Sequence, residues 1–195
     1  MSGRWIGKSQ EPDTDELLAA SLPIAGSAVR VLSPLHNMIQ VSLHTAKHSF
    51  VRAPGLRLHT DVDRLAAFAP PDWTAVAELA ETMTIRTPVF FSLALSRALL
   101  GAAVPDAVLD RLAPARWKVG AVCRALRRCD VFEPFERKFS RLGMVRFHSL
   151  LFDDLRGWCA SASGVDRGEV KLWRTPALLW GAVPRVVDLV CRYQR

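Results

Sequence analysis

The chain has 195 residues, half of them hydrophobic, which is enough for a buried core and excludes a globally disordered protein. Its formal net charge of +7 at pH 7 favours acidic or phosphate-bearing partners but says nothing about the fold. The four cysteines form no CxxC pair, which excludes a disulfide scaffold and is typical of buried thiols in a reducing compartment.

No stretch of the sequence has the pattern of a membrane span. The N-terminal residues lack the apolar run of a signal peptide. The most apolar stretch, residues 88–100, contains Ser92, Ser96 and Arg97 and is too short to cross a bilayer. We therefore expect a cytoplasmic protein without a membrane partner.

The first elements in chain order are a short helix through residues 17–19, with Asp13 or Thr14 as its cap, and a short strand at 29–32. Ser33 followed by Pro34 predicts the start of a long helix, because the serine can cap the free N–H groups and proline needs no partner for its own nitrogen. We expect this helix to span residues 34–50, since a Pro-Gly pair follows shortly afterwards.

The remainder of the chain also shows helical periodicity, punctuated by Asp72 as a cap, by Thr87–Pro88 as a cap with proline, and by Gly101 as a stop. Further helices are predicted at residues 59–68, 73–85, 89–100, 105–112, 115–128, 133–142, 145–160 and 184–193. Alternating patterns are scarce, so the predicted fold is an all-α helical bundle with one short strand before residue 33.

Histidines and cations gather near the end of the long helix. His44 and His48 are four residues apart and share one side of a helix, as zinc ligands often do, but Thr45 stands where a zinc-protease motif has glutamate. We therefore do not expect a metal site there. Lys47, His48 and Arg52 are instead suited as a group to bind a phosphate or an acceptor, and His44 can orient them or donate a hydrogen bond. The lysine would hold phosphate oxygens as a point charge and the arginine as a two-pronged donor.

Asp61 follows in the next predicted helix and has two interpretations. It can hold Arg52 or Lys47 in position for a ligand. Alternatively, it caps its own helix, while the cations complement the dipole of the preceding helix or simply line a solvent-exposed face. The residues alone do not separate these alternatives.

Three segments together resemble the C-terminal helical half of bacterial, polymerase-beta-like nucleotidyltransferases that are uncharacterised. They are "RVLSPLHNMIQVSLHTAKHSFVRAPGLRLHTDVDRLAA", "DWTAVAELAE" and "LALSRALLGAAVPDAVLDRL". The resemblance covers about residues 24–113. The matching positions are Ser33–Pro34, His44, Lys47, His48, Asp61, Asp72–Trp73 and residues 99–105.

The resemblance implies an enzyme of two parts. An α/β half would carry a Gly-Ser motif and the carboxylates that bind Mg²⁺, and the helical half would close over the nucleotide or the acceptor. In this chain Gly26–Ser27 is not followed by such carboxylates. Three cases are open: a helical remnant without activity, a chain that pairs with a separately encoded catalytic subunit, or a start that omits upstream sequence.

The expected organisation has three parts: a polar segment at 1–23, the helical domain at 24–113, and a basic helical region at 114–195. Cations concentrate between residues 116 and 146. This pattern favours an alternative function, a non-catalytic module that binds nucleic acid or an acidic protein. The other interpretation of the same pattern is a solvated basic helix face with no ligand.

Overall fold

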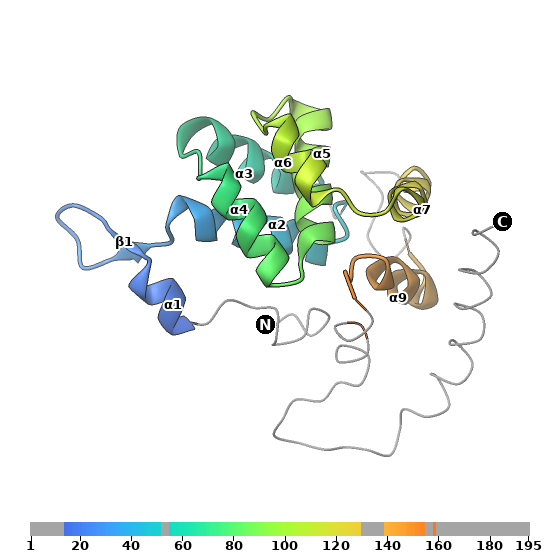
Figure 1. Ribbon diagram of the computed structural model, residues 1–195, viewed down its shortest axis with the longest axis horizontal. Helices are drawn as coiled ribbons and strands as arrows, with labels where there is room; N and C mark the ends of the chain where they lie inside the picture. Colours follow the sequence, from blue (N-terminus) through green and yellow to red (C-terminus); the bar gives the residue numbers. More distant parts are fainter. Residues whose placement is uncertain (1–13, 52–54, 130–138, 155–157, 159–195) are drawn as a thin grey trace, which may run out of the picture.

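The structure, a computed structural model, describes residues 14–51, 55–129, 139–154 and 158 (Figure 1). In these ranges the chain is mainly helical and has one two-stranded sheet, so the predicted fold class is confirmed. No helix in these ranges combines the length and the apolar character needed to cross a membrane. The predicted helix at 184–193 lies outside the described residues.

Helix α1 (Thr14–Ala19) leads into an antiparallel hairpin of β1 (Leu22–Pro23) and β2 (Arg30–Val31). The tip of the hairpin contains Gly26 with a φ of 73°, a left-handed conformation that glycine adopts without steric cost. The strand predicted at 29–32 is confirmed. Its partner β1 is not predicted, because two residues that include a proline show no alternation.

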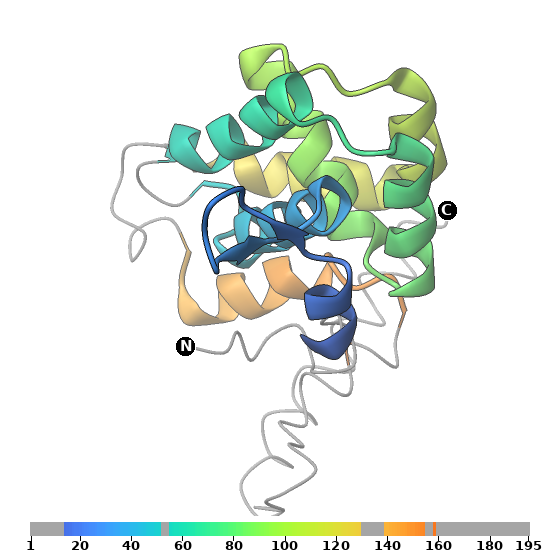
Figure 2. The same cartoon turned by 90° about the vertical axis from the view of Figure 1, so that its left-hand side faces the viewer.

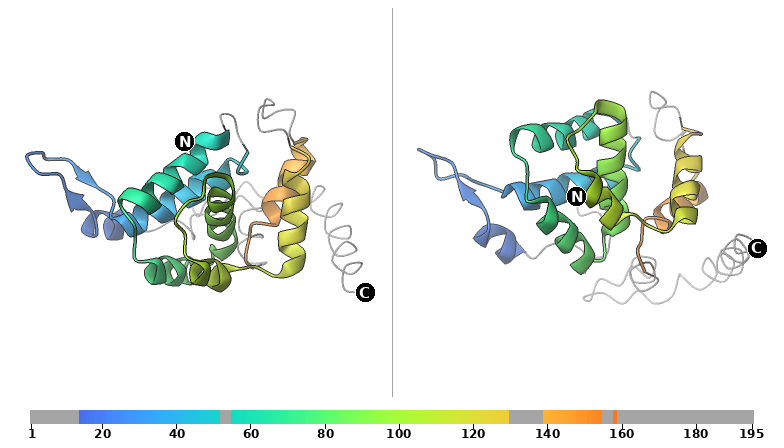
Figure 3. Two further views of the ribbon diagram at one scale, coloured as in Figure 1. Left: turned by 90° about the horizontal axis from the view of Figure 1, so that it is seen from above. Right: turned by 45° about the horizontal axis from the view of Figure 1, so that its top comes forward.

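One side of this hairpin is apolar, and we call it the hairpin face. Leu22 pairs with Val31, and the Ile24 N–H donates to the Val29 carbonyl at 3.2 Å, so these four side chains lie on the same side. All four are between 42% and 58% exposed. Figures 1 and 3 show the hairpin projecting away from the helices, and Figure 2 shows it in front of them.

The long helix α2 (Pro34–Lys47) begins as predicted. The Ser33 side chain accepts a hydrogen bond from the His36 N–H, and Pro34 occupies the first turn. The helix ends three residues earlier than predicted, because Ser49 and Phe50 adopt positive φ values of 55° and 62° and turn the chain out of the helix.

The next two helices differ from their predicted bounds at one end. Helix α3 (Gly55–Phe68) starts four residues before the predicted start at His59. Glycine is a weak helix former, but the burial of His59, Val62 and Ala66 on one face of α3 outweighs this cost. Helix α4 (Trp73–Thr82) is capped as predicted, since the Asp72 carboxylate accepts from two backbone N–H groups at 2.9 and 3.2 Å.

Helix α5 (Arg86–Leu100) ends at Gly101 as predicted, and helix α6 (Asp106–Leu112) follows the predicted range closely. The prediction that Thr87 caps α5 is wrong. The helix starts at Arg86, and both the N–H and the hydroxyl of Thr87 donate to the carboxylate of Asp153. A residue far along the chain therefore supplies the cap, which no local pattern reveals.

The last helices lie side by side in Figures 1 and 3. Helix α7 (Arg116–Leu126) confirms the prediction for 115–128 apart from its last residues. Helix α9 spans Arg141–Ser149, so the predicted start at Val145 and the predicted end at Ala160 are both wrong. Ser140 explains its start, because the serine hydroxyl accepts from the Gly143 N–H at 3.1 Å. The prediction for 133–142 lies mostly outside the described residues, and its last two residues belong to α9.

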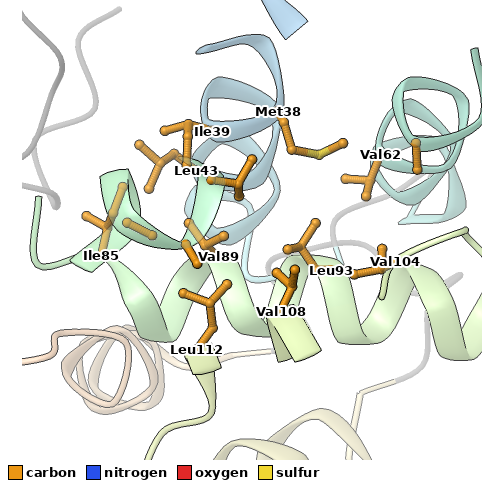
Figure 4. Packing of buried hydrophobic residues seen from close by; sticks show 14 of the residues in the cluster. Met38, Ile39, Leu43, Val62, Ile85, Val89, Leu93, Val104, Val108 and Leu112 are labelled. Carbon is orange, nitrogen blue, oxygen red and sulfur yellow. The ribbon is translucent and has the colours of Figure 1, made fainter. Parts of the chain in front are cut away.

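Two groups of buried side chains hold the helices together. In the first cluster α2, α3, α4, α5 and α6 meet (Figure 4). Its larger members are Met38, Ile39, Leu43, Val62, Ile85, Val89, Leu93, Val104, Val108 and Leu112. The second cluster joins the end of α2 and the middle of α5 to α7 and α9, through Ala46, Phe50, Phe91, Val122, Phe147 and Leu151.

Polar contacts add to the second cluster. The Lys118 ammonium of α7 donates to the Phe152 carbonyl at 2.8 Å. Burial lowers the pKa of Lys118, and nearby Arg86 lowers it further, whereas the Asp153 carboxylate opposes the shift. The helices after residue 113 are thus packed on those before it. The predicted division at 23 and 113 stays a prediction.

Candidate functional site at the end of helix α2

The last turn of α2 carries three nitrogen-bearing side chains on one side. His44 is exposed, and Lys47 and His48 are partly exposed, because the other side of the helix, with Leu43 and Ala46, packs into the core. The rings of His44 and His48 meet edge to face with their centroids 4.6 Å apart. The structure therefore brings together three of the five predicted site residues.

The other two predicted site residues are not part of this turn. Asp61 is exposed on α3 and forms no ion pair with another described residue. Arg52 lies outside the described residues. The role that Asp61 would have in positioning Lys47 or Arg52 stays a prediction.

The backbone behind the turn is held by long-range contacts. The Phe50 N–H donates to the Thr45 carbonyl at 3.0 Å and closes the helix end. The Phe50 ring is fully buried and lies 6.0 Å from Phe91 and 6.2 Å from Phe147, measured between ring centroids. Left-handed conformations of residues other than glycine persist where surrounding packing enforces them, and here an aromatic cluster does so.

His59 at the start of α3 supports the same turn from inside. It is only 2% exposed, and burial lowers its pKa, partly opposed by a hydrogen bond to the Phe50 carbonyl, so the ring is neutral near pH 7. A carbonyl only accepts, which places the single proton on Nε2, 3.0 Å from Phe50 O. Nδ1 lies 3.1 Å from the Ser96 hydroxyl, which donates to the Ser92 carbonyl at 2.7 Å. This histidine is a structural residue of the core.

His148 reaches the turn from α9. Its Nε2 lies 3.1 Å from the Ser49 hydroxyl, which is also 3.4 Å from the Met144 sulfur. Burial lowers the pKa of His148 to about 4, so this imidazole is neutral at pH 7. Sequence reasoning missed it, because 99 residues separate the two partners and helical spacing carries no information over that distance.

The chemistry available on this turn is that of cations and imidazole groups. A lysine ammonium binds phosphate oxygens as a point charge, and an imidazole N–H can donate to them. The same groups also complement the negative end of the α2 dipole, a role that needs no ligand. In the described part of the chain no three His, Cys, Asp or Glu side chains gather closely enough to hold a metal ion.

The fold and the site thus define an all-α protein with cationic and imidazole side chains at the end of α2, where Phe50 packs the following turn into the core. Comparison with known protein families shows which family the chain belongs to. The model of the uncharacterised nucleotidyltransferase family matches residues 2–101, and the chain belongs to this family. The match includes α1 to α5, and therefore His44, Lys47, His48 and Asp61. No curated protein and no solved structure matches the chain.

Proposed function

We propose that the chain acts in Mg²⁺-dependent nucleotidyl transfer, as a helical unit that binds the nucleotide or the acceptor. The single observation behind the proposal is that the family match includes the turn that gathers His44, Lys47 and His48. In such a transfer the acceptor hydroxyl attacks the α-phosphorus, the bond to the β-phosphate oxygen breaks, and pyrophosphate leaves.

Each residue has a distinct role in the proposed complex. Lys47 contacts phosphate oxygens as a point charge, and Arg52 contacts them through its two-pronged guanidinium. His44 and His48 donate hydrogen bonds or stack against the ligand. Asp61 orients the cations from α3.

These residues do not fit Mg²⁺ itself, which prefers several carboxylate oxygens. The candidate site offers one carboxylate, Asp61, on a different helix from the histidines and lysine. We therefore assign the ion to carboxylates outside this site, on a catalytic half that is missing here or separately encoded.

Thermal unfolding with and without Mg²⁺ and each of ATP, GTP, CTP and UTP tests the proposal. A nucleotide that binds only the folded chain at about 100 times its Kd stabilises it by about 2.7 kcal/mol. For a chain of this size that corresponds to a rise in Tm of roughly 5–10 °C. Lys47→Ala and Arg52→Ala should each remove the shift.

Arg64→Ala is the matched control, because Arg64 is an exposed cation of α3 and its loss changes the net charge by the same amount. The control should keep the shift. If none of the four nucleotides raises the Tm, nucleotide binding by this helical unit is ruled out. Pyrophosphate release with a candidate catalytic subunit then tests whether the unit binds the acceptor instead.

A further inference from the structure

The solvent side of α7 and of the turn that follows it presents four arginines and one tryptophan. Positions 116, 120, 124 and 127 follow at spacings of four, four and three residues and so form one line along the helix. Every residue on this line is exposed, and so are its neighbours at 117 and 128. We call this surface the arginine face. It consists of Arg116, Trp117, Arg124, Arg127 and Arg128.

The orientation of the arginine face is fixed by the opposite side of α7. Val122 is fully buried in the second cluster, with Val119, Cys123 and Leu126 packed around it. The partly buried Lys118 ammonium donates to a backbone carbonyl in the turn after α9 and lies 6.0 Å from the centroid of the Trp117 ring, so it borders the arginine face and is not one of its exposed cations. The helix therefore cannot rotate its arginines away without exposing this core.

The charge on the face is of one sign. No aspartate or glutamate occurs between residues 116 and 129. Like charges one turn apart repel each other and weaken a helix, and a solvated helix face usually mixes both signs. All exposed cations of α7 are arginines, whose planar guanidinium matches phosphate oxygens in pairs. A polyanion complements this arrangement.

Trp117 narrows the class of polyanion. Its side chain is 51% exposed at the first turn of α7, beside Arg116. An acidic peptide would need only the arginines, whereas a nucleic acid base can stack on an exposed indole ring. Stacking requires an unpaired base, because the faces of paired bases are covered by their neighbours in a duplex.

We propose that the arginine face binds single-stranded nucleic acid, with phosphates on Arg116, Arg127 and Arg128 and a base stacked on Trp117. The face lies on α7, beyond the residues that match the nucleotidyltransferase family. The site is separate from the turn of α2, so it exists whether or not the chain takes part in nucleotidyl transfer.

Fluorescence anisotropy of a labelled, mixed-sequence single strand with the full chain tests the proposal. Trp117→Ala should weaken binding roughly fivefold to a hundredfold, and Trp117→Phe should restore most of it, because stacking of one base contributes that much. Binding of the corresponding duplex should be weaker and should not respond to Trp117→Ala.

The salt dependence measures the phosphate contacts. Between about 50 and 200 mM salt, Arg127→Gln/Arg128→Gln should reduce the slope of log K against log salt by roughly 1.4, about 0.7 for each phosphate contact on a single strand. The control Arg57→Gln/Arg64→Gln removes the same charge from exposed positions of α3 and should leave the slope nearly unchanged.

Three results would overturn the proposal. The first is no binding of the single strand at low salt. The second is equal or tighter binding of duplex or polyglutamate, which would indicate a surface for duplex or for acidic protein. The third is an equal effect of the α3 control and the Arg127→Gln/Arg128→Gln variant. Circular dichroism of each variant establishes that it is folded.

Discussion

Ser49 and Phe50 adopt the left-handed backbone conformation without the help of glycine. For an ordinary residue this conformation costs roughly 1–2 kcal/mol. The cost is offset because Phe50 fills the second cluster and its carbonyl accepts from His59, while the Ser49 hydroxyl reaches His148. The backbone that carries His48 is therefore positioned by the core.

Substitution of Ser49 separates this backbone cost from the hydroxyl contact. Ser49→Gly and Ser49→Ala both lose the hydrogen bond to His148, but only glycine adopts a φ of 55° without strain. We expect the glycine variant to be more stable than the alanine variant by about 1 kcal/mol in urea unfolding.

Gln40 provides the control for that comparison, because it is exposed within α2, where φ is helical. There the order should reverse, with Gln40→Ala more stable than Gln40→Gly by about 1 kcal/mol. The same order at both positions would show that Ser49 bears no conformational strain.

Residue-level chemistry could be predicted only in part. Helical spacing correctly places His44, Lys47 and His48 on one turn. It gives no sign that His59 is a buried core residue or that His148 lies behind the turn, since both depend on partners in other helices. Periodicity describes one helix at a time and therefore does not predict contacts between helices.

Helix α9 docks on the end of α2 through a neutral imidazole. The pKa of His148 is lowered from 6.5 to about 4 by burial, so the folded chain binds fewer protons there than the unfolded chain between these values. The contribution of His148 to stability is therefore fully present above pH 6.5 and is lost progressively as the pH falls toward 4.

The buried neutral imidazole of His148 predicts that the protein is less stable in acid. The free energy of unfolding should fall by at most about 3 kcal/mol from this group between about pH 7 and pH 4. His59, whose pKa burial also lowers, acts in the same direction. Urea unfolding of the wild type and of His148→Gln at several pH values measures how much of the pH dependence of the unfolding free energy comes from His148. An unchanged pH dependence in the variant would contradict this account.

At the scale of elements, the signals that work are local. Ser33–Pro34, Asp72 and Gly101 each mark a helix end by a contact or a φ value within a few residues. The predicted helix ends are wrong where tertiary contacts determine where a helix begins. The Asp153 carboxylate replaces Thr87 as the cap of α5, and the packing of α3 through His59, Val62 and Ala66 outweighs the weak helix propensity of Gly55.

At the scale of the whole molecule, the described residues form two clusters that share α2 and α5. The first cluster lies among α2 to α6, and the second adds α7 and α9. Parts of a protein with separate buried contacts can open separately, with different free energies. We therefore expect α7 and α9 to open before the helices of the first cluster.

Hydrogen exchange of two core variants tests this order. Leu112→Ala leaves a hole in the first cluster and should cost about 2–5 kcal/mol. Because α7 and α9 open while the first cluster is intact, this variant should speed amide exchange in the helices of the first cluster and leave exchange in α7 and α9 nearly unchanged. Phe147→Ala should cost about 3–5 kcal/mol and should speed exchange in both parts, since the helices of the first cluster open only after α7 and α9 have opened. Equally faster exchange of α7 and α9 in Leu112→Ala would mean that both clusters unfold as one unit.

The hairpin face has a consequence for the colloidal behaviour of the protein. With a net charge of +7, copies repel one another at low ionic strength and their aliphatic hairpins stay apart in water. At about 1 M salt the repulsion reaches only about 3 Å, whereas the attraction between apolar surfaces remains. Leu22, Ile24, Val29 and Val31 then form the point of first contact, so solubility decreases as salt is added.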